Sequence, residues 1–253
     1  MMNPPYRSIN PLVFVLIHGS WADTSFWDGI SAELRQMRHN VHAVPYAGHD
    51  SDPNRQATHA MIVKSVVDYI VQRGLTDIVL VGHSFGGTVI QKTAEQIPER
   101  IKRLVFLNAF VLPDGQSLAD QLPPAAVDTF TQLRKASTDD TISLPYALFR
   151  ESFANLGSEE QAKWLFDRTP AEPAGPLFEK LGLKRFYSLQ IPRSYVYLTE
   201  DNVFPQTDEY SFHPRMSARL GLYRLIKGTG DHMVTPRYEP GYVARLLYMG
   251  ARD

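Results

Sequence analysis

The chain has 253 residues, of which 43% are hydrophobic and 21% charged, and its formal net charge is −1. This length and balance suit a globular α/β protein whose core needs no metal or disulfide for stability. The nearly neutral charge gives no reason to expect a nucleic-acid partner or an anionic membrane surface. Because the chain has no cysteine, disulfides, a cysteine nucleophile and cysteine-ligated zinc are excluded.

The chain opens with the polar, proline-rich stretch MMNPPYRSIN, followed by a short apolar run at 11–17. The stretch lacks a basic start and a small-residue cleavage site, and the apolar run is too short to cross a bilayer. We therefore expect no signal peptide, no membrane partner and a soluble cytoplasmic protein.

Short apolar runs rich in β-branched residues recur along the chain between longer amphipathic stretches. The stretches 26–37 and 59–74 repeat apolar residues every three or four positions, which predicts helices. The alternation of runs and stretches is typical of a mostly parallel sheet flanked by helices. The predicted strands are 13–17, 41–46, 78–82, 103–108, 194–199 and 222–227.

This alternation stops in the middle of the chain, where prolines are frequent and no strand is evident. Helical patterns lie at 144–156 and 158–168, and the whole stretch is too long to be one loop of a compact domain. We therefore expect a helical lid at 111–188, inserted between a first part of the core (1–110) and a second part (189–253).

The segment IVLVGHSFGG (78–87) joins a predicted strand to a helical pattern through a glycine-rich turn. Residues 82–86 match G-x-S-x-G, the nucleophile elbow. This turn projects a serine hydroxyl from the end of a strand, and small residues on either side let strand and helix approach closely. A glycine-rich turn without chemistry has a similar sequence, but the flanking strand and helix favour Ser84 as a nucleophile.

A serine nucleophile needs a base, and in this type of fold the acid and the histidine follow the serine in the chain. His232 lies in a loop between a predicted strand and the last helix, and this context favours it over His213. His83 adjoins the predicted nucleophile, and its side chain is expected to point away from it. His83 is therefore a candidate for the substrate site and not for the base.

The acid should follow the strand that precedes the histidine loop. Glu200 and Asp201 stand there, and either can hold the imidazole in the required tautomer. Asp208 and Asp231 are weaker candidates.

An oxyanion hole needs two backbone N–H groups. The residue after the nucleophile, Phe85, supplies one, and the loop after the first strand supplies the other. In that loop Gly19 permits a sharp turn that aims the N–H of Ser20 at the site.

The segments HGSWADTSFW, LVGHSFGG, RLVFLNAFVLPDG, YLTEDNVFP and GTGDHM together resemble the α/β-hydrolase superfamily, across 12–114 and 190–249. Within it, the chain is most similar to the plant methylesterases and hydroxynitrile lyases and to small bacterial esterases. This resemblance implies an α/β-hydrolase fold, with Ser84 as nucleophile, His232 as base and Asp201 as acid. It also implies that the N–H groups of Ser20 and Phe85 bind the oxyanion.

Two positions separate the esterases from the lyases of this branch. The resemblance places threonine in the lyases where this chain has Gly19, and lysine, which stabilises the cyanide leaving group, where it has Met233. Glycine and methionine match the esterases. The expected activity is therefore serine-dependent hydrolysis of a small to medium, largely apolar or aromatic carboxylic ester or lactone, with no metal and no cofactor.

Several further side chains are candidates for the substrate site. Those in the predicted lid have helical spacing, which is also typical of residues that pack within a lid. The candidates are Gly19, Trp21, His83, Tyr146, Phe149, Phe153, Trp164 and Met233.

Other functions stay open on the same residues. They are a hydroxynitrile lyase or other enzyme that cleaves carbon–carbon bonds, a cofactor-free dioxygenase, and a small-molecule binder without catalysis. The sequence also leaves open whether the protein forms a homodimer.

Overall fold

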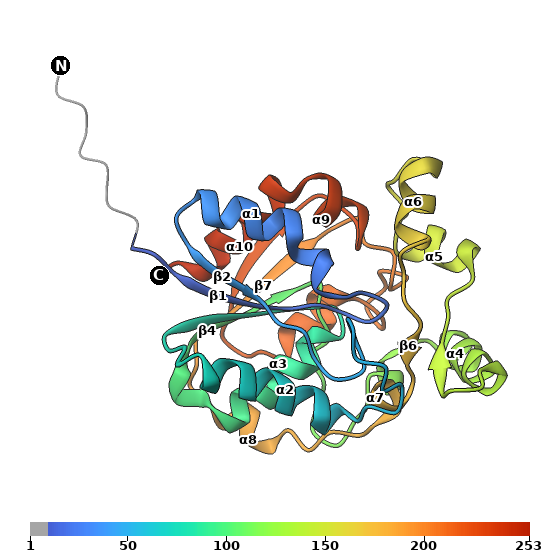
Figure 1. The fold of residues 1–253 in the computed structure, drawn as a ribbon, viewed down its shortest axis with the longest axis horizontal. Helices are drawn as coiled ribbons and strands as arrows, with labels where there is room; N and C mark the ends of the chain where they lie inside the picture. Colours follow the sequence, from blue (N-terminus) through green and yellow to red (C-terminus); the bar gives the residue numbers. More distant parts are fainter. Residues whose placement is uncertain (1–9) are drawn as a thin grey trace.

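A computed structural model describes residues 10–253, so the predicted absence of a signal peptide concerns a segment that lies largely outside the described residues. Six strands form one fully parallel sheet in the order β2-β1-β3-β4-β7-β8 (Figure 1). The strands are β1 (Val13–Ile17), β2 (Asn40–Ala43), β3 (Ile78–His83), β4 (Ile101–Leu107), β7 (Arg193–Leu198) and β8 (Arg224–Gly228).

Helices cover both faces of this sheet (Figure 1). Along β1, Phe14 and Leu16 pack with the cluster that includes residues of α1 and α10, whereas Val15 and Ile17 pack with α2 and α3. Successive side chains of a strand point to opposite faces, so a continuous apolar run buries both. The helices are α1 (Asp28–Gln36), α2 (His59–Gln72), α3 (Gly86–Gln96) and α10 (Pro240–Ala251).

All six predicted strands of the core are present, with ends that differ by a few residues. The largest difference is at β2, which begins at Asn40 and ends at Ala43 rather than at residue 46. Pro45 lies just beyond this end and has no N–H to continue the ladder. The predicted helix at 26–37 is divided into the 3₁₀ turn η1 (Thr24–Trp27) and α1.

The chain between β4 and β7 forms a separate group of short elements, and we call residues 111–188 the insertion. Its main helices stand beyond one edge of the core in Figure 1. Contrary to expectation, the insertion also contains two strands of two residues each, which pair antiparallel. Its elements are η3 (Ala119–Gln121), α4 (Pro124–Ala136), β5 (Thr141–Ile142), α5 (Tyr146–Ser152), α6 (Glu159–Phe166), β6 (Glu172–Pro173), α7 (Gly175–Phe178) and α8 (Lys184–Ser188).

Not all of the insertion lies near the carboxyl ends of the strands. Helix α8 packs instead against α3 on the face of the core. Within residues 10–253, no helix is long and apolar enough to cross a membrane. The remaining elements are η2 (Pro98–Arg100), the π-helical turn η4 (Phe212–Met216) and α9 (Val234–Tyr238).

Candidate active site

Ser84 occupies a strained turn between β3 and α3. Its φ is 54°, in the left-handed region that side chains other than glycine rarely adopt. The glycines on either side permit the turn, because a Cβ on Gly82 would lie 2.6 Å from the carbonyl oxygen of Gly86. A Cβ on Gly86 would in turn lie 2.6 Å from the carbonyl oxygen of Ile17. The motif thus meets a steric requirement that only glycine satisfies.

The loops after β7 and β8 bring Asp201 and His232 together. The Nδ1 atom of His232 lies 2.5 Å from Oδ2 of Asp201, and both side chains are buried. An imidazole that donates from Nδ1 leaves Nε2 to accept a proton. Within residues 10–253 no hydrogen bond links the Ser84 hydroxyl to His232, whose recorded side-chain hydrogen bond is the one to Asp201.

Asn108, at the end of β4, supports the candidate acid Asp201 and was not anticipated from the sequence. Its Nδ2 group donates to Oδ2 of Asp201 at 2.6 Å, and its Oδ1 atom accepts the Leu198 N–H at 2.7 Å. The backbone N–H of Val203 donates to the other oxygen of Asp201 at 2.9 Å. The available signal was a polar residue that ends the apolar run RLVFLN, at the same sheet edge as Ser84.

The alternative acids and the alternative base have other partners. Asp231 accepts the backbone N–H groups of Thr235 and Leu156, and burial raises the pKa of its carboxyl. Glu200 accepts the N–H of Gly230. The ring of His213 makes its hydrogen bond with the hydroxyl of Ser217, at 2.7 Å.

Two backbone N–H groups flank Ser84 without an acceptor. Neither the N–H of Ser20 nor that of Phe85 makes a hydrogen bond within the described part of the chain. The N–H of Phe85 lies at the start of α3, where the helix dipole favours negative charge. Gly19 brings its loop against Ser84, since a Cβ there would lie 2.6 Å from Cβ of Ser84. Both donors are available to a developing oxyanion.

Ser84 and Ser20 border a cavity of about 470 Å³ between the core and the insertion. No charged residue is among those that line it, and most are apolar. Helix α4 and the turn before it provide a large part of the wall. The lining residues are Ser20, Trp21, Ser84, Phe110, Leu118, Leu122, Pro123, Ala125, Ala126, Thr129, Phe130, Leu148, Ser152, Phe153, Leu177, Asn202, Val203 and Pro205.

The family model described as "Alpha/beta hydrolase family" matches residues 14–246, which include every element of this site. The chain belongs to the alpha/beta hydrolase family. Among solved structures, an extracellular alpha/beta-hydrolase from a Paenibacillus species is 55% identical with a TM-score of 0.95, over 96% of this chain and 100% of its own. It is described as sharing structural and functional homology with tobacco salicylic acid binding protein 2.

The curated relatives agree with the predicted branch of this family. A carbendazim hydrolyzing esterase from Nocardioides sp. is 38% identical over 44% of this chain and 48% of its own length. The chain thus spans about half of that relative. Methylesterase 1 of Arabidopsis thaliana is 26% identical over 76% of this chain and 80% of its own. The alpha-hydroxynitrile lyase of the same plant is 33% identical over 87% of this chain and 90% of its own length.

In this alpha/beta hydrolase, only part of the predicted substrate site lines the cavity. Trp21 and Phe153 do so, whereas Phe149 is fully buried within the insertion against Phe153 and Phe166. The hydroxyl of Tyr146 donates to Glu159 on α6 instead. Neither Tyr146 nor Phe149 is among the residues that line the cavity. The wall formed by α4 was missed, although Leu122, Ala126, Thr129 and Phe130 recur at helical spacing.

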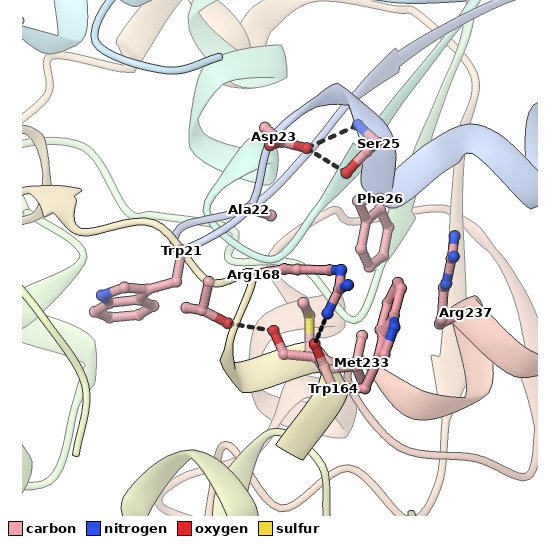
Figure 2. A pocket seen from close by; sticks show the side chains of 11 residues that line it. Trp21, Ala22, Asp23, Ser25, Phe26, Trp164, Arg168, Met233 and Arg237 are labelled. Atoms are coloured by element: carbon pink, nitrogen blue, oxygen red, sulfur yellow. Dashed lines mark hydrogen bonds between the residues drawn. The ribbon is translucent and has the colours of Figure 1, made fainter. Parts of the chain in front are cut away.

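Trp164 and Met233 line a smaller hollow, of about 60 Å³, beside the main cavity. Figure 2 shows the Trp164 ring between two guanidinium groups, and Trp21, which borders both spaces, pointing away from this hollow. The guanidinium carbons of Arg168 and Arg237 lie 3.9 and 4.6 Å from the centre of the Trp164 ring. Stacking with these cations places Trp164 outside the cavity that contains Ser84.

His83 and Gly19 contact residues of the candidate site but do not line its cavity. The His83 ring lies 4.4 Å, between centroids, from both the Phe26 ring and the His232 ring, and it does not line the cavity. Burial holds the pKa of His83 well below its ordinary value, so the ring is neutral. Gly19 contacts Ser84 and His83 through close packing and is likewise absent from the cavity wall.

Proposed function

We propose that this protein is a carboxylic ester hydrolase that forms an acyl-enzyme on Ser84. His232 takes the hydroxyl proton through Nε2 as Oγ attacks the ester carbonyl, and Asp201 stabilises the resulting imidazolium. The oxyanion accepts the N–H groups of Ser20 and Phe85. His232 then protonates the departing alcohol and activates the water that releases the acid. The observation that carries this proposal is a strained serine flanked by two backbone N–H groups without acceptors.

We infer that the substrate is a neutral, largely apolar ester or lactone of small to medium size. A cavity of about 470 Å³ without a charged lining residue suits such a molecule. A substrate with a free carboxylate or phosphate would lose its hydration there without gaining a cation. Aromatic rings at Trp21, Phe110, Phe130 and Phe153 favour an aromatic or branched acyl group.

The Ser84→Ala variant tests the nucleophile. Alanine tolerates the same backbone geometry about as well as serine, so the variant should fold with an unchanged circular dichroism spectrum. We expect its kcat on p-nitrophenyl acetate and butyrate to fall at least about 10⁴-fold, the loss typical of serine nucleophiles. Wild-type protein should also react with a fluorophosphonate probe, and the variant should not. A folded variant with substantial turnover would overturn the proposal, and failure of the wild type to react would favour a binder.

A hydroxynitrile lyase is the second candidate, because the Arabidopsis alpha-hydroxynitrile lyase is 33% identical over most of both chains. Two observations favour hydrolysis. Met233 follows the candidate base where a lysine would be expected, and no cation lines the cavity. A departing cyanide would therefore lack electrostatic stabilisation. Incubation with mandelonitrile should release no cyanide above the uncatalysed rate, and Ser84-dependent release would favour the lyase.

A cytoplasmic location stays a proposal that rests on a composition without cysteine. The similar Paenibacillus protein is described as extracellular, so both compartments need a direct test. Fractionation of the native host, followed by detection with the fluorophosphonate probe, should find the protein in the cytosol. Its recovery from the medium would contradict this proposal.

A further inference from the structure

Beneath the loop that carries Ser20 lies a buried ion pair that the proposed chemistry does not use. Glu172, on β6 of the insertion, is fully buried, and its Oε2 atom lies 3.0 Å from Nε2 of His49. The other ring nitrogen of His49 lies 3.1 Å from the carbonyl oxygen of Ala47. An ionised Glu172 and the Ala47 carbonyl only accept hydrogen bonds, and the two ring nitrogens of His49 are placed to donate to them. Glu172 raises the pKa of His49 despite burial, which favours an imidazolium beside a carboxylate.

The same carboxylate oxygen also contacts the loop that follows β1. Oε2 of Glu172 accepts the backbone N–H of Trp21 at 2.8 Å. Trp21 has φ of 55°, in the left-handed region that is strained for a residue with a large side chain. It persists only where the surroundings hold it. We call residues 19–21 the oxyanion loop, because they include the candidate donor Ser20.

Trp21 is held at both of its N–H groups by one small element. Its indole Nε1 atom donates to the carbonyl oxygen of Ile142 at 2.8 Å. Ile142 on β5 and Glu172 on β6 are paired residues of the two-stranded sheet in the insertion. This sheet therefore presents two acceptors side by side, one for the backbone and one for the side chain of Trp21.

A role in stability alone does not account for a carboxylate at this position. The Oε1 atom of Glu172 is buried without a hydrogen-bond partner among the described residues. Such an orphan acceptor costs free energy that an apolar residue would avoid. What the carboxylate provides is a strong, charge-assisted acceptor for one specific N–H group.

We propose that Glu172 is a positioning residue that holds the oxyanion loop in its active conformation, with the contact to His49 orienting its carboxylate. The peptide that carries the Ser20 N–H is adjacent to the one whose N–H binds Glu172. Fixing the second peptide restricts rotation of the first, so the insertion participates in catalysis through the loop. This inference rests on the proposed esterase function.

Two substitutions of Glu172 separate its hydrogen bond from its charge. Glu172→Ala removes the acceptor for Trp21, and we expect kcat for p-nitrophenyl acetate to fall at least 20-fold with KM changed less than threefold. Glu172→Gln retains an oxygen acceptor and should keep kcat within about fivefold of the wild type. Assays are run well below the melting temperature of each variant, so that the unfolded fraction does not contribute.

Glu179 provides a matched control. Its carboxylate also lies in the insertion and accepts a core backbone N–H, that of His59 at 2.9 Å, but far along the chain from the oxyanion loop. Glu179→Ala should leave kcat within twofold of the wild type. An effect on kcat equal to that of Glu172→Ala would overturn the proposal, because it would reflect general loosening of the insertion.

Binding of an alkylboronic acid gives a readout that does not depend on turnover. Its tetrahedral adduct with Ser84 places an oxygen in the oxyanion hole, so Glu172→Ala should weaken this binding by about the same factor as kcat. Unchanged boronate affinity and kcat in the folded variant would overturn the proposal, and so would equal losses in the alanine and glutamine variants. A wild type that binds boronate but hydrolyses no ester would contradict the esterase function and leave the loop assignment testable through the boronate.

Discussion

At the scale of single residues, the orientation of the candidate base depends on side chains that surround it. Asp201 receives donors from three directions: His232, the amide of Asn108 and the backbone of Val203. These contacts leave the carboxylate little freedom to rotate. The ring of His232 is further enclosed by aromatic neighbours, including Phe153 in an edge-on contact at 5.4 Å between centroids. Such packing supports an orientation competent for proton transfer.

Removal of the Asn108 side chain tests this support. Asn108→Ala removes one of the two hydrogen bonds that Oδ2 of Asp201 accepts and leaves the Leu198 N–H without its partner, which we expect to lower the free energy of unfolding by about 1–3 kcal/mol. The freed carboxylate should also hold His232 less firmly, and kcat should fall about tenfold, equivalent to about 1.4 kcal/mol. Urea unfolding and steady-state kinetics measure the two effects.

Asn155→Ala is the control for this substitution. The Asn155 side chain also donates to a backbone carbonyl oxygen nearby, that of Glu200 at 2.8 Å, but it does not contact Asp201. Its loss should leave kcat unchanged. If Asn108→Ala kept full kcat, the support assigned to Asn108 would be wrong.

At the scale of elements, the insertion shapes the cavity more through α4 than through α5, and no residue of α6 lines it. Four cavity residues, Ala125, Ala126, Thr129 and Phe130, belong to α4. Phe149 and Phe166, by contrast, pack against each other between α5 and α6. The size of residues on the inner face of α4 should therefore decide which acyl groups fit.

Ala126→Phe tests the role of α4 by filling part of the cavity. The larger ring should exclude bulky acyl groups, since filled space cannot be regained without distorting the packed wall. We expect kcat/KM for p-nitrophenyl hexanoate to fall at least about tenfold, or about 1.4 kcal/mol, while the acetate ester changes little. Gln132→Phe, at an exposed position of the same helix, is the control. Equal losses on both esters would show that Ala126 does not border the acyl site.

At the scale of the whole molecule, several histidines are buried, and burial lowers the pKa of their side chains. Burial lowers the pKa of His59 to about 3 and holds that of His83 well below its ordinary value. Burial lowers the pKa of His39, His42 and His213 as well. The unfolded chain takes up these protons near pH 6.5, whereas the folded chain does not. Acidification below pH 6.5 therefore favours unfolding. His49, whose pKa is raised by Glu172 despite burial, acts in the opposite direction.

His59→Gln should reduce this dependence on pH. Glutamine can keep a hydrogen bond to Thr88 Oγ1, which lies 2.9 Å from Nε2 of His59, but it takes up no proton in the unfolded state. Between pH 6.5 and 4.5 the wild type should lose about 2 kcal/mol of unfolding free energy through His59, and the variant should not. Urea titrations at both pH values measure the difference, with His213→Gln as a partly exposed control. Identical slopes for His59→Gln and the wild type would refute the assignment.

The sequence by itself determined the core of the fold. The six strands of the sheet follow from apolar runs whose spacing is local, and each lies within a few residues of its predicted position. The candidate nucleophile can also be predicted from sequence. The turn around Ser84 leaves no room for a Cβ at positions 82 and 86, so both must be glycine, and these glycines stand two residues from the serine in the sequence. Asp201 and His232 follow from chain order within the family, and their assigned roles stay predictions until the variants are measured.

Only the tertiary structure decided which distant residues support these groups. The contact between Glu172 and Trp21 spans 151 residues, and the one between Asn108 and Asp201 spans 93. A single carboxylate or amide has no periodicity, so no local pattern marks it before the chain is folded. The cavity wall is equally inaccessible from sequence, because helical spacing shows that α4 has an apolar face but not what that face borders. The physical reason is that packing between elements, rather than propensity within them, selects the neighbours of each side chain.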